Sequence, residues 1–173
     1  HGPFVSINCG ALPKDLLESN LFGHMRGSFT GAIKDQQGLF TVSENGTFFL
    51  DEVGEMAAAT QVKLLRALQE REIIPVGGTK PIKTEFRLIA ATNVDLEKAV
   101  REGRFREDLY YRINVIPIKM PPLRERAEDI APLGEFFLQR YNTRFRKRVQ
   151  GITDSTLELL KKHSWPGNIR ELE

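Results

Sequence analysis

The 173-residue chain is long enough for one domain with a buried core and a small appended subdomain. Its composition, 40% hydrophobic and 28% charged, contains no apolar run near the roughly 20 residues that span a bilayer, which excludes a membrane-spanning protein. The net charge of +2 is too small to indicate nucleic-acid binding by bulk electrostatics, so any DNA contact would have to be local.

Strand and helix signals alternate along the first half of the chain. Residues 4–9 form a β-rich run, and Pro13 then opens an amphipathic helix that reaches residue 22. An Asn-Gly turn at 45–46 precedes the apolar strand "TFFL" at 47–50. One cysteine, Cys9, cannot form an internal disulfide; we expect a small buried residue in a reducing, cytoplasmic setting.

The same alternation continues to residue 120. Apolar residues at helical spacing predict a helix over 57–70, and "FRLIAATN" at 86–93 is a nearly continuous apolar strand of the kind buried in a parallel sheet. Short helices are expected at 94–100 and 106–112, and "NVIPIKM" at 114–120 is expected to be a further strand. The predicted fold class is therefore α/β.

The pattern changes at Pro121. A proline-marked hinge is followed by helical segments only, which predicts an α/β domain over 1–120 and an all-helical subdomain over 121–173. The chain does not begin with Met and ends inside an expected helix, so we expect it to be a fragment.

Two acids follow the strand at 47–50. Asp51 and Glu52 stand at its carboxyl end, where ligand sites gather in open α/β sheets. In a nucleotide hydrolase the first acid would hold Mg²⁺ and the second would polarise the attacking water. The alternative interpretation is a solvated acidic turn.

Polar side chains also follow the strand at 86–93. Thr92 and Asn93 could hydrogen-bond a γ-phosphate or the lytic water if this strand lies beside the first one. Alternatively, they cap the helix that follows.

Three arginines are candidates for contact with a nucleotide. Arg106 and Arg112 could project as arginine fingers toward a nucleotide on a neighbouring subunit, or form ordinary surface ion pairs. Arg170, in "WPGNIREL", could sense the nucleotide from the helical subdomain or be a plain surface residue.

The stretch "GSFTGA" has neither a helical nor a strand period, and it places the apolar Phe29 where a loop is normally polar. An exposed phenylalanine is unfavourable unless a partner sometimes buries it, so the loop is a candidate contact site. Its residues are Gly27, Ser28, Phe29, Thr30, Gly31 and Ala32.

Six motifs occur in order: "NLFGHMRGSFTGA", "GTFFLDEV", "LIAATN", "GRFREDLYYRINV", "PPLRER" and "WPGNIREL". Together they closely resemble the central AAA+ ATPase domain of bacterial enhancer-binding proteins, the sigma-54-dependent transcription activators, over essentially the whole chain. The resemblance implies a P-loop-type parallel sheet sandwiched by helices, followed by a small helical lid.

The resemblance also implies roles for these residues. Asp51 and Glu52 would be the Walker B acids, with Asp51 binding Mg²⁺ beside ATP, and Asn8 would restrain Glu52. Thr92 and Asn93 would be the first sensor, Arg106 and Arg112 the arginine fingers, and Arg170 the second sensor. The loop at residues 27–32 would bind sigma-54, and the hairpin at residues 71–87 would be the second pore loop.

The resemblance further implies that the intact protein forms a homo-oligomeric ring, a hexamer, in the cytoplasm. It would bind sigma-54 of RNA polymerase through the tip at Phe29 and Thr30, and promoter or enhancer DNA through a C-terminal domain absent from these residues.

Two departures from the family pattern stand out. Ser28 replaces the usual alanine of the loop. In addition, no part of the sequence matches the GxxxxGK[ST] phosphate loop, which in the family lies with its strand and helix just before the positions that match residues 2–4. We therefore expect these residues alone to bind ATP poorly and hardly hydrolyse it. The rival interpretations are a non-catalytic sigma-binding module and a AAA+ chaperone or unfoldase, although the latter would not need "GSFTGA".

Overall fold

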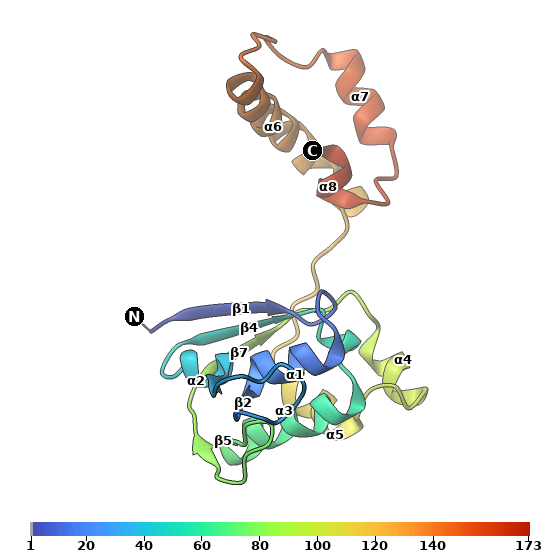
Figure 1. The fold of residues 1–173 in the computed structure, drawn as a ribbon. Helices are drawn as coiled ribbons and strands as arrows, with labels where there is room; N and C mark the ends of the chain where they lie inside the picture. Colours follow the sequence, from blue (N-terminus) through green and yellow to red (C-terminus); the bar gives the residue numbers. More distant parts are fainter. Residues whose placement is uncertain (1) are drawn as a thin grey trace. The chain divides into compact units, whose positions relative to one another are not determined.

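The computed structural model describes residues 2–173, which form two compact units, 2–116 and 117–173 (Figure 1). The first unit mixes strands and helices, and the second is helical. Among residues 2–173, no helix combines the length and the apolar character needed to cross a bilayer.

A parallel sheet of three strands organises the first unit, in the order β1-β4-β7. The strands are β1 (Phe4–Asn8), β4 (Thr47–Asp51) and β7 (Arg87–Ala90). Because parallel strands in register end together, Asn8 lies opposite Asp51 and Leu50 lies opposite Ala90 at one edge of the sheet. The expected α/β class is confirmed.

Successive side chains of the central strand, β4, point to opposite faces of the sheet, and one of these faces is buried. Phe48 and Leu50 are fully buried, whereas Phe49, on the opposite face, stacks on Phe4, which is 66% exposed. The buried face packs against three helices that lie on one side of the sheet in Figure 1, namely α1 (Lys14–Phe22), α2 (Leu39–Val42) and α3 (Ala58–Glu70).

Helix α1 starts and stops where the sequence indicates. Pro13 precedes its first residue, and Gly23, with φ 80°, ends it by donating its backbone N–H to the carbonyl of Ser19. A Cβ on Gly23 would lie 2.5 Å from the carbonyl oxygen of Gln36, so the close approach of the two chains requires glycine.

Smaller elements complete the first unit. Two antiparallel pairs of short strands hold the loops, and two helices and one 3₁₀ turn follow the sheet strands. Their bounds are β2 (Gly23–His24) with β3 (Gln36–Gln37), β5 (Glu72–Ile73) with β6 (Ile82–Lys83), η1 (Val53–Glu55), α4 (Leu96–Arg101) and α5 (Glu107–Ile113).

The strand expected at 114–120 does not form, and that prediction is wrong. Helix α5 ends at Ile113, and the following segment is irregular, with Ile116 and Ile118 more than 80% exposed. An apolar run becomes a strand only beside a partner that accepts its hydrogen bonds, and no described strand pairs with it. Among the described strands, β7 likewise pairs with β4 and no other, and Ile89 is 39% exposed.

The second unit is all-helical, as predicted. A small core of Leu123, Ile130 and Trp165 holds it together, and the Trp165 indole donates to the carbonyl of Leu160 at 2.7 Å. Its elements are η2 (Leu123–Glu125), η3 (Ala127–Asp129), α6 (Ile130–Phe145), α7 (Asp154–Lys162) and α8 (Asn168–Leu172).

Candidate functional site

The ends of the three sheet strands are joined by backbone hydrogen bonds. The N–H of Cys9 donates to the carbonyl of Asp51 at 2.9 Å, and the N–H of Val53 donates to the carbonyl of Ala91 at 3.0 Å. These bonds continue the ladder past the strand ends. They bring the segments that carry Asn8, the two acids and Thr92 to a single edge.

The two acids are fixed by the backbone at the end of β4. The Asp51 carboxylate accepts the N–H of Glu52 at 2.9 Å, and Glu52 has a left-handed conformation with φ 54°. Few residues other than glycine adopt this conformation, and non-glycine cases cluster at functional sites. Both side chains are half-buried, which suits carboxylates that must meet a ligand.

The side chains of Asn8 and Glu52 both lie close to Gly10. The Asn8 amide oxygen accepts the N–H of Gly10 at 2.8 Å and that of Ala11 at 3.0 Å. A Cβ placed on Gly10 would lie only 2.3 Å from Glu52 Oε2, so the carboxylate occupies the space that a side chain there would fill. No hydrogen bond joins Asn8 to Glu52 within residues 2–173, and the restraining role of Asn8 stays a prediction.

Thr92 packs against the turn that follows the acids. A Cβ on Gly54 would lie 2.9 Å from Thr92 Oγ1, which accepts the N–H of Val94 at 3.1 Å. Asn93 is exposed. The cap of helix α4 is Asp95, which accepts the N–H of Lys98, so neither Thr92 nor Asn93 occupies the N-cap position.

Cys9 is buried beside the acids. Only 3% of it is exposed, and burial, followed by the charges of Asp51 and Glu52, raises the pKa of its thiol to about 12. The thiol therefore stays protonated and unreactive at neutral pH. The expectation of a small buried residue is confirmed.

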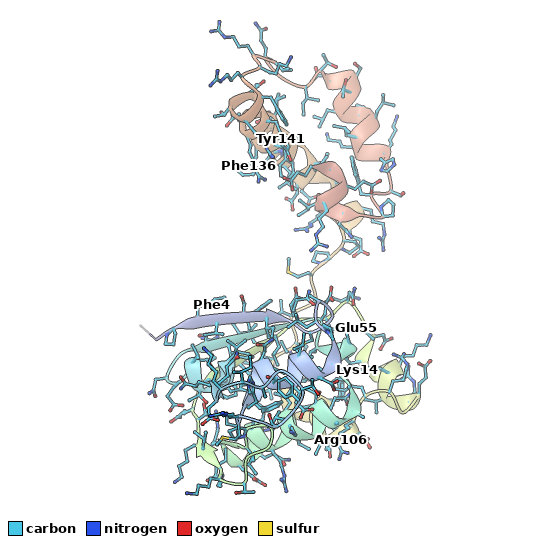
Figure 2. The ribbon with its side chains drawn as sticks, in the orientation of Figure 1. Phe4, Lys14, Glu55, Arg106, Phe136 and Tyr141 are labelled. Carbon is cyan, nitrogen blue, oxygen red and sulfur yellow. The ribbon has the colours of Figure 1, made fainter. Side chains whose placement is uncertain are left out.

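The two candidate arginine fingers are engaged within the first unit. Arg106, labelled in Figure 2, donates from Nε and Nη2 to the Asp108 carboxylate at 3.0 and 2.7 Å. This pairing raises the pKa of Arg106 and lowers that of Asp108. Arg112 Nη2 donates to the carbonyl of Leu68 at 2.8 Å, and neither arginine hydrogen-bonds Glu52 among the described residues.

A buried glutamine that sequence reasoning missed positions Arg106. Gln61, on α3, is fully buried, and its side-chain amide donates to the carbonyls of Met56 and Arg104. Its Oε1 accepts the backbone N–H of Arg106 at 2.9 Å. A polar residue on the inner side of a helix was the only sequence signal. Arg170 lies exposed on α8 of the second unit.

The loop at 27–32 is folded on itself. Gly27 donates to the carbonyl of Ala32 at 2.8 Å, and Ala32 donates to the carbonyl of Phe29 at 3.0 Å. Gly27 and Gly31 have φ of 81° and 102°, values that favour glycine. Thr30 is exposed and Phe29 is 37% exposed, while Ala32 is buried.

The contacts beneath Phe29 were not foreseen from the sequence. Its ring meets the ring of His24 edge-on, with centroids 5.0 Å apart. His24 is buried, and its Nδ1 is hydrogen-bonded to Ser19 Oγ of α1 at 2.7 Å. A serine and a histidine five residues apart across a helix end carry no signal of such a pair.

The loop also packs on the hairpin at 71–87. Met25 donates its N–H to the carbonyl of Val76 at 2.9 Å, and a Cβ on Gly77 would lie 2.5 Å from the Cβ of Ser28. The Ser28 hydroxyl is buried and has no hydrogen-bond partner among residues 2–173. The two loops therefore form one unit, and the serine adds a polar atom exactly where they touch.

The edge residues fit part of a magnesium–nucleotide site. Mg²⁺ in such sites takes one or two protein carboxylates and completes its shell with phosphates and water, which Asp51 and its half-buried position allow. Within residues 2–173 no group of three or more acidic, histidine or cysteine side chains forms a metal cage of its own.

The sheet topology, the edge acids and the helical second unit define an α/β ATPase-type domain of the AAA+ class. The family model for the sigma-54 interaction domain matches residues 1–119, and that for the AAA+ ATPase lid domain matches residues 124–173. The chain belongs to the sigma-54 interaction domain family, and the resemblance noted in the sequence is confirmed.

Relatives agree with this assignment. The chain is 56% identical to the transcriptional regulatory protein ZraR of Klebsiella oxytoca and 54% identical to the Nif-specific regulatory protein of Azotobacter vinelandii. The matches cover 99% and 100% of this chain but 39% and 33% of those proteins. The structure of NtrX from Brucella abortus in complex with ATP matches with a TM-score of 0.89 at 37% identity, over 99% of this chain and 37% of NtrX.

Proposed function

We propose that the full-length protein is a transcription activator that couples ATP hydrolysis to remodelling of the closed complex of sigma-54 RNA polymerase. The observation that carries the proposal is the edge at which Asp51, Glu52 and Thr92 come together, at or just after the carboxyl ends of neighbouring strands of one parallel sheet. The ATP bound by the similar NtrX, and the match of residues 1–119 to the sigma-54 interaction domain, support it.

Each edge residue has a defined task in hydrolysis. Asp51 would hold Mg²⁺, which supplies charge neutralisation on the phosphates when bound. Glu52 would accept the proton of the attacking water, because its carboxylate lies beside Gly10 at the carboxyl end of β4. Asn8 would hold that carboxylate back in the resting state, and Thr92 and Asn93 would hydrogen-bond the terminal phosphate or the water.

The active form is proposed to be a homo-oligomeric ring, a hexamer, with nucleotides at subunit interfaces. Arg106 and Arg112 would then serve a neighbour's nucleotide, which requires Arg106 to exchange Asp108 for phosphate oxygens. Arg170 would report the nucleotide to the second unit. These 173 residues contain no GxxxxGK[ST] loop, and on their own we expect them to hydrolyse ATP poorly.

The loop at 27–32 is the proposed contact for sigma-54. Phe29 and Thr30 present an apolar ring and a hydroxyl at the tip of a loop whose turns are closed by its own backbone. Ser28 would tune how the tip moves with the hairpin at 71–87. Promoter DNA would be bound by a further domain, and the protein would act in the cytoplasm.

The test uses the full-length protein, purified sigma-54 and a transition-state analogue of ATP. We expect steady-state ATP turnover together with capture of sigma-54 that depends on the analogue. Capture without any turnover would instead identify a non-catalytic sigma-binding module. Turnover without capture would place the protein among AAA+ enzymes with other partners.

A further inference from the structure

Helix α6 ends in a dense group of cations that the proposed function does not use. Residues 140–148 contain five cations and no acid, although the whole chain has a net charge of only +2. All five are exposed. We call this group the basic arm; its members are Arg140, Arg144, Arg146, Lys147 and Arg148.

Most of the arm's charge is uncompensated. Arg140 forms an ion pair with Glu173 at 2.8 Å, and the other four cations form none within residues 2–173. Arginine outnumbers lysine four to one in the arm. Its planar fork pairs with phosphate oxygens through two parallel hydrogen bonds, which the lysine ammonium cannot do.

The arm is held in a defined shape by Asn142. Its side-chain amide donates to the carbonyl of Val149 at 2.8 Å and accepts the N–H of Val149 at 3.0 Å. Its backbone carbonyl accepts the N–H of Lys147 at 3.0 Å, and Arg146 has a left-handed conformation with φ 52°. The turn after α6 is therefore ordered, which lowers the entropy that the arm would lose on binding a ligand.

Aromatic rings lie among the cations. Tyr141, labelled in Figure 2, stacks on Phe145 with ring centroids 5.7 Å apart and planes 13° apart. The guanidinium of Arg144 lies 5.6 Å from the centre of the Phe145 ring, which is 60% exposed. Exposed aromatic rings beside arginines are the surfaces on which unpaired bases stack.

A membrane surface fits this group less well. The exposed phenylalanines of α6, Phe136 and Phe145, are nine residues apart, and at about 100° per residue they lie on opposite sides of the helix. Insertion into lipid needs one continuous apolar face. A mere solvated surface would not require the Asn142 clamp that fixes the turn.

We propose that the basic arm binds nucleic acid, with its arginines on the phosphodiester backbone and Phe145 stacking on unpaired bases. None of its residues belongs to the sheet edge or to the loop at 27–32, since all of them lie in the second unit. Nucleic acid would then bind to this local group of cations, which agrees with a net charge of the whole chain that is only +2.

The experiment measures binding of the full-length protein to labelled duplex DNA of arbitrary sequence and to its single strand, by fluorescence anisotropy over a series of salt concentrations. The variant Arg146→Glu/Arg148→Glu is compared with Lys161→Glu/Lys162→Glu, which makes the same change of charge at exposed cations of α7. The difference between variants isolates the arm from any other DNA-binding region of the protein.

We expect the arm variant to bind both nucleic acids at least tenfold more weakly and to lower the slope of log K against log salt by about 2, since two phosphate contacts are lost. The control should change affinity less than threefold. Equal losses in the two variants, or none in either, would overturn the proposal. Melting curves check that both variants are folded.

Two further measurements define the ligand. Phe145→Ala should weaken single-strand binding about tenfold and leave duplex binding unchanged, because stacking acts only on unpaired bases. Vesicles containing anionic lipid and a polyglutamate chain are offered as competitors. If either binds through the arm and displaces DNA at comparable charge concentration, the arm is a general polyanion site and the nucleic-acid proposal fails.

Discussion

The carboxyl edge of the sheet and the loop at 27–32 are held in place by different kinds of contact. At the edge, three strands in register and a ladder continued by Cys9 and Val53 fix the acids, which are half-buried. The loop depends on its own turns, on the contact of Ser28 with the hairpin, and on the Phe29 ring, which meets the ring of His24 edge-on. Changes at the edge should therefore alter chemistry, and changes in the loop should alter partner contact.

Of the substitutions proposed, replacement of the second acid, Glu52, should change ATP turnover the most. Glu52→Gln removes the proposed proton acceptor while keeping the shape of the side chain, and ATP turnover of the full-length protein should fall by about 10² to 10⁴-fold. Nucleotide binding and sigma-54 capture should persist. Glu55→Gln, an exposed acid three residues along, is the control and should leave turnover unchanged. Similar turnover in both variants would remove Glu52 from catalysis.

The loop substitution Phe29→Ala should reverse this pattern. Turnover should stay within twofold of the parent, and sigma-54 capture in the presence of the ATP analogue should drop at least tenfold. Because the ring is 37% exposed and packs on His24, we expect a loss of only about 1 kcal/mol in unfolding free energy.

Phe40→Ala is the matched control for the stability of the loop variant. Phe40 is fully buried, and its loss should cost about 3 to 5 kcal/mol. Chemical denaturation of both variants measures the difference. A comparable loss in Phe29→Ala would mean that the ring is part of the core, and normal sigma-54 capture would mean that the loop is not the contact.

The space beside Glu52 can be tested with a single methyl group. A Cβ at Gly10 would lie 2.3 Å from Glu52 Oε2, so Gly10→Ala should displace the carboxylate and slow ATP turnover about tenfold. Gly151→Ala, whose Cβ would meet nothing within 4 Å, should have no effect on turnover. A parent-like rate in Gly10→Ala would show that the position of this carboxylate is not critical.

The parts of the fold that could be predicted from the sequence are those that depend on the pattern of neighbouring residues. The apolar runs that became β4 and β7 end at Asp51 and shortly before Thr92, so the shared edge followed from the rule that parallel strands end together. The stretch at 27–32 was expected to be a loop because it has neither a helical nor a strand period, and in the structure Gly27 and Gly31 have positive φ within it.

The parts that it missed depend on contacts between distant segments. The run at 114–120 has strand-forming residues, but no strand in the described part of the chain pairs with it, so its local preference does not decide its structure. Gln61 contacts Arg106 across 45 residues, and Ser28 meets Gly77 across the two loops. Pairing of this kind leaves no periodic signal in a single sequence.

The smallest expected effect concerns the support beneath the loop. Ser19 is buried, and its hydroxyl is hydrogen-bonded to His24 Nδ1 at 2.7 Å, directly under Phe29. Ser19→Ala leaves that buried nitrogen without its partner, at a cost of about 1 to 2 kcal/mol. Without this hydrogen bond the His24 ring supports Phe29 less firmly, and the loop should open more often. Native-state trypsin cleavage after the exposed Arg26 should therefore accelerate about threefold.

Ser43→Ala separates this local effect from a general loss of stability. Ser43 is equally buried, and its hydroxyl donates to the carbonyl of Phe40 at 2.8 Å in the core, so its removal also deletes one buried hydrogen bond. Both variants should melt at lower temperature, but only Ser19→Ala should speed cleavage after Arg26. If the two variants are cleaved at the same rate, the loop opens through global unfolding, and its dependence on the pair of Ser19 and His24 is disproved.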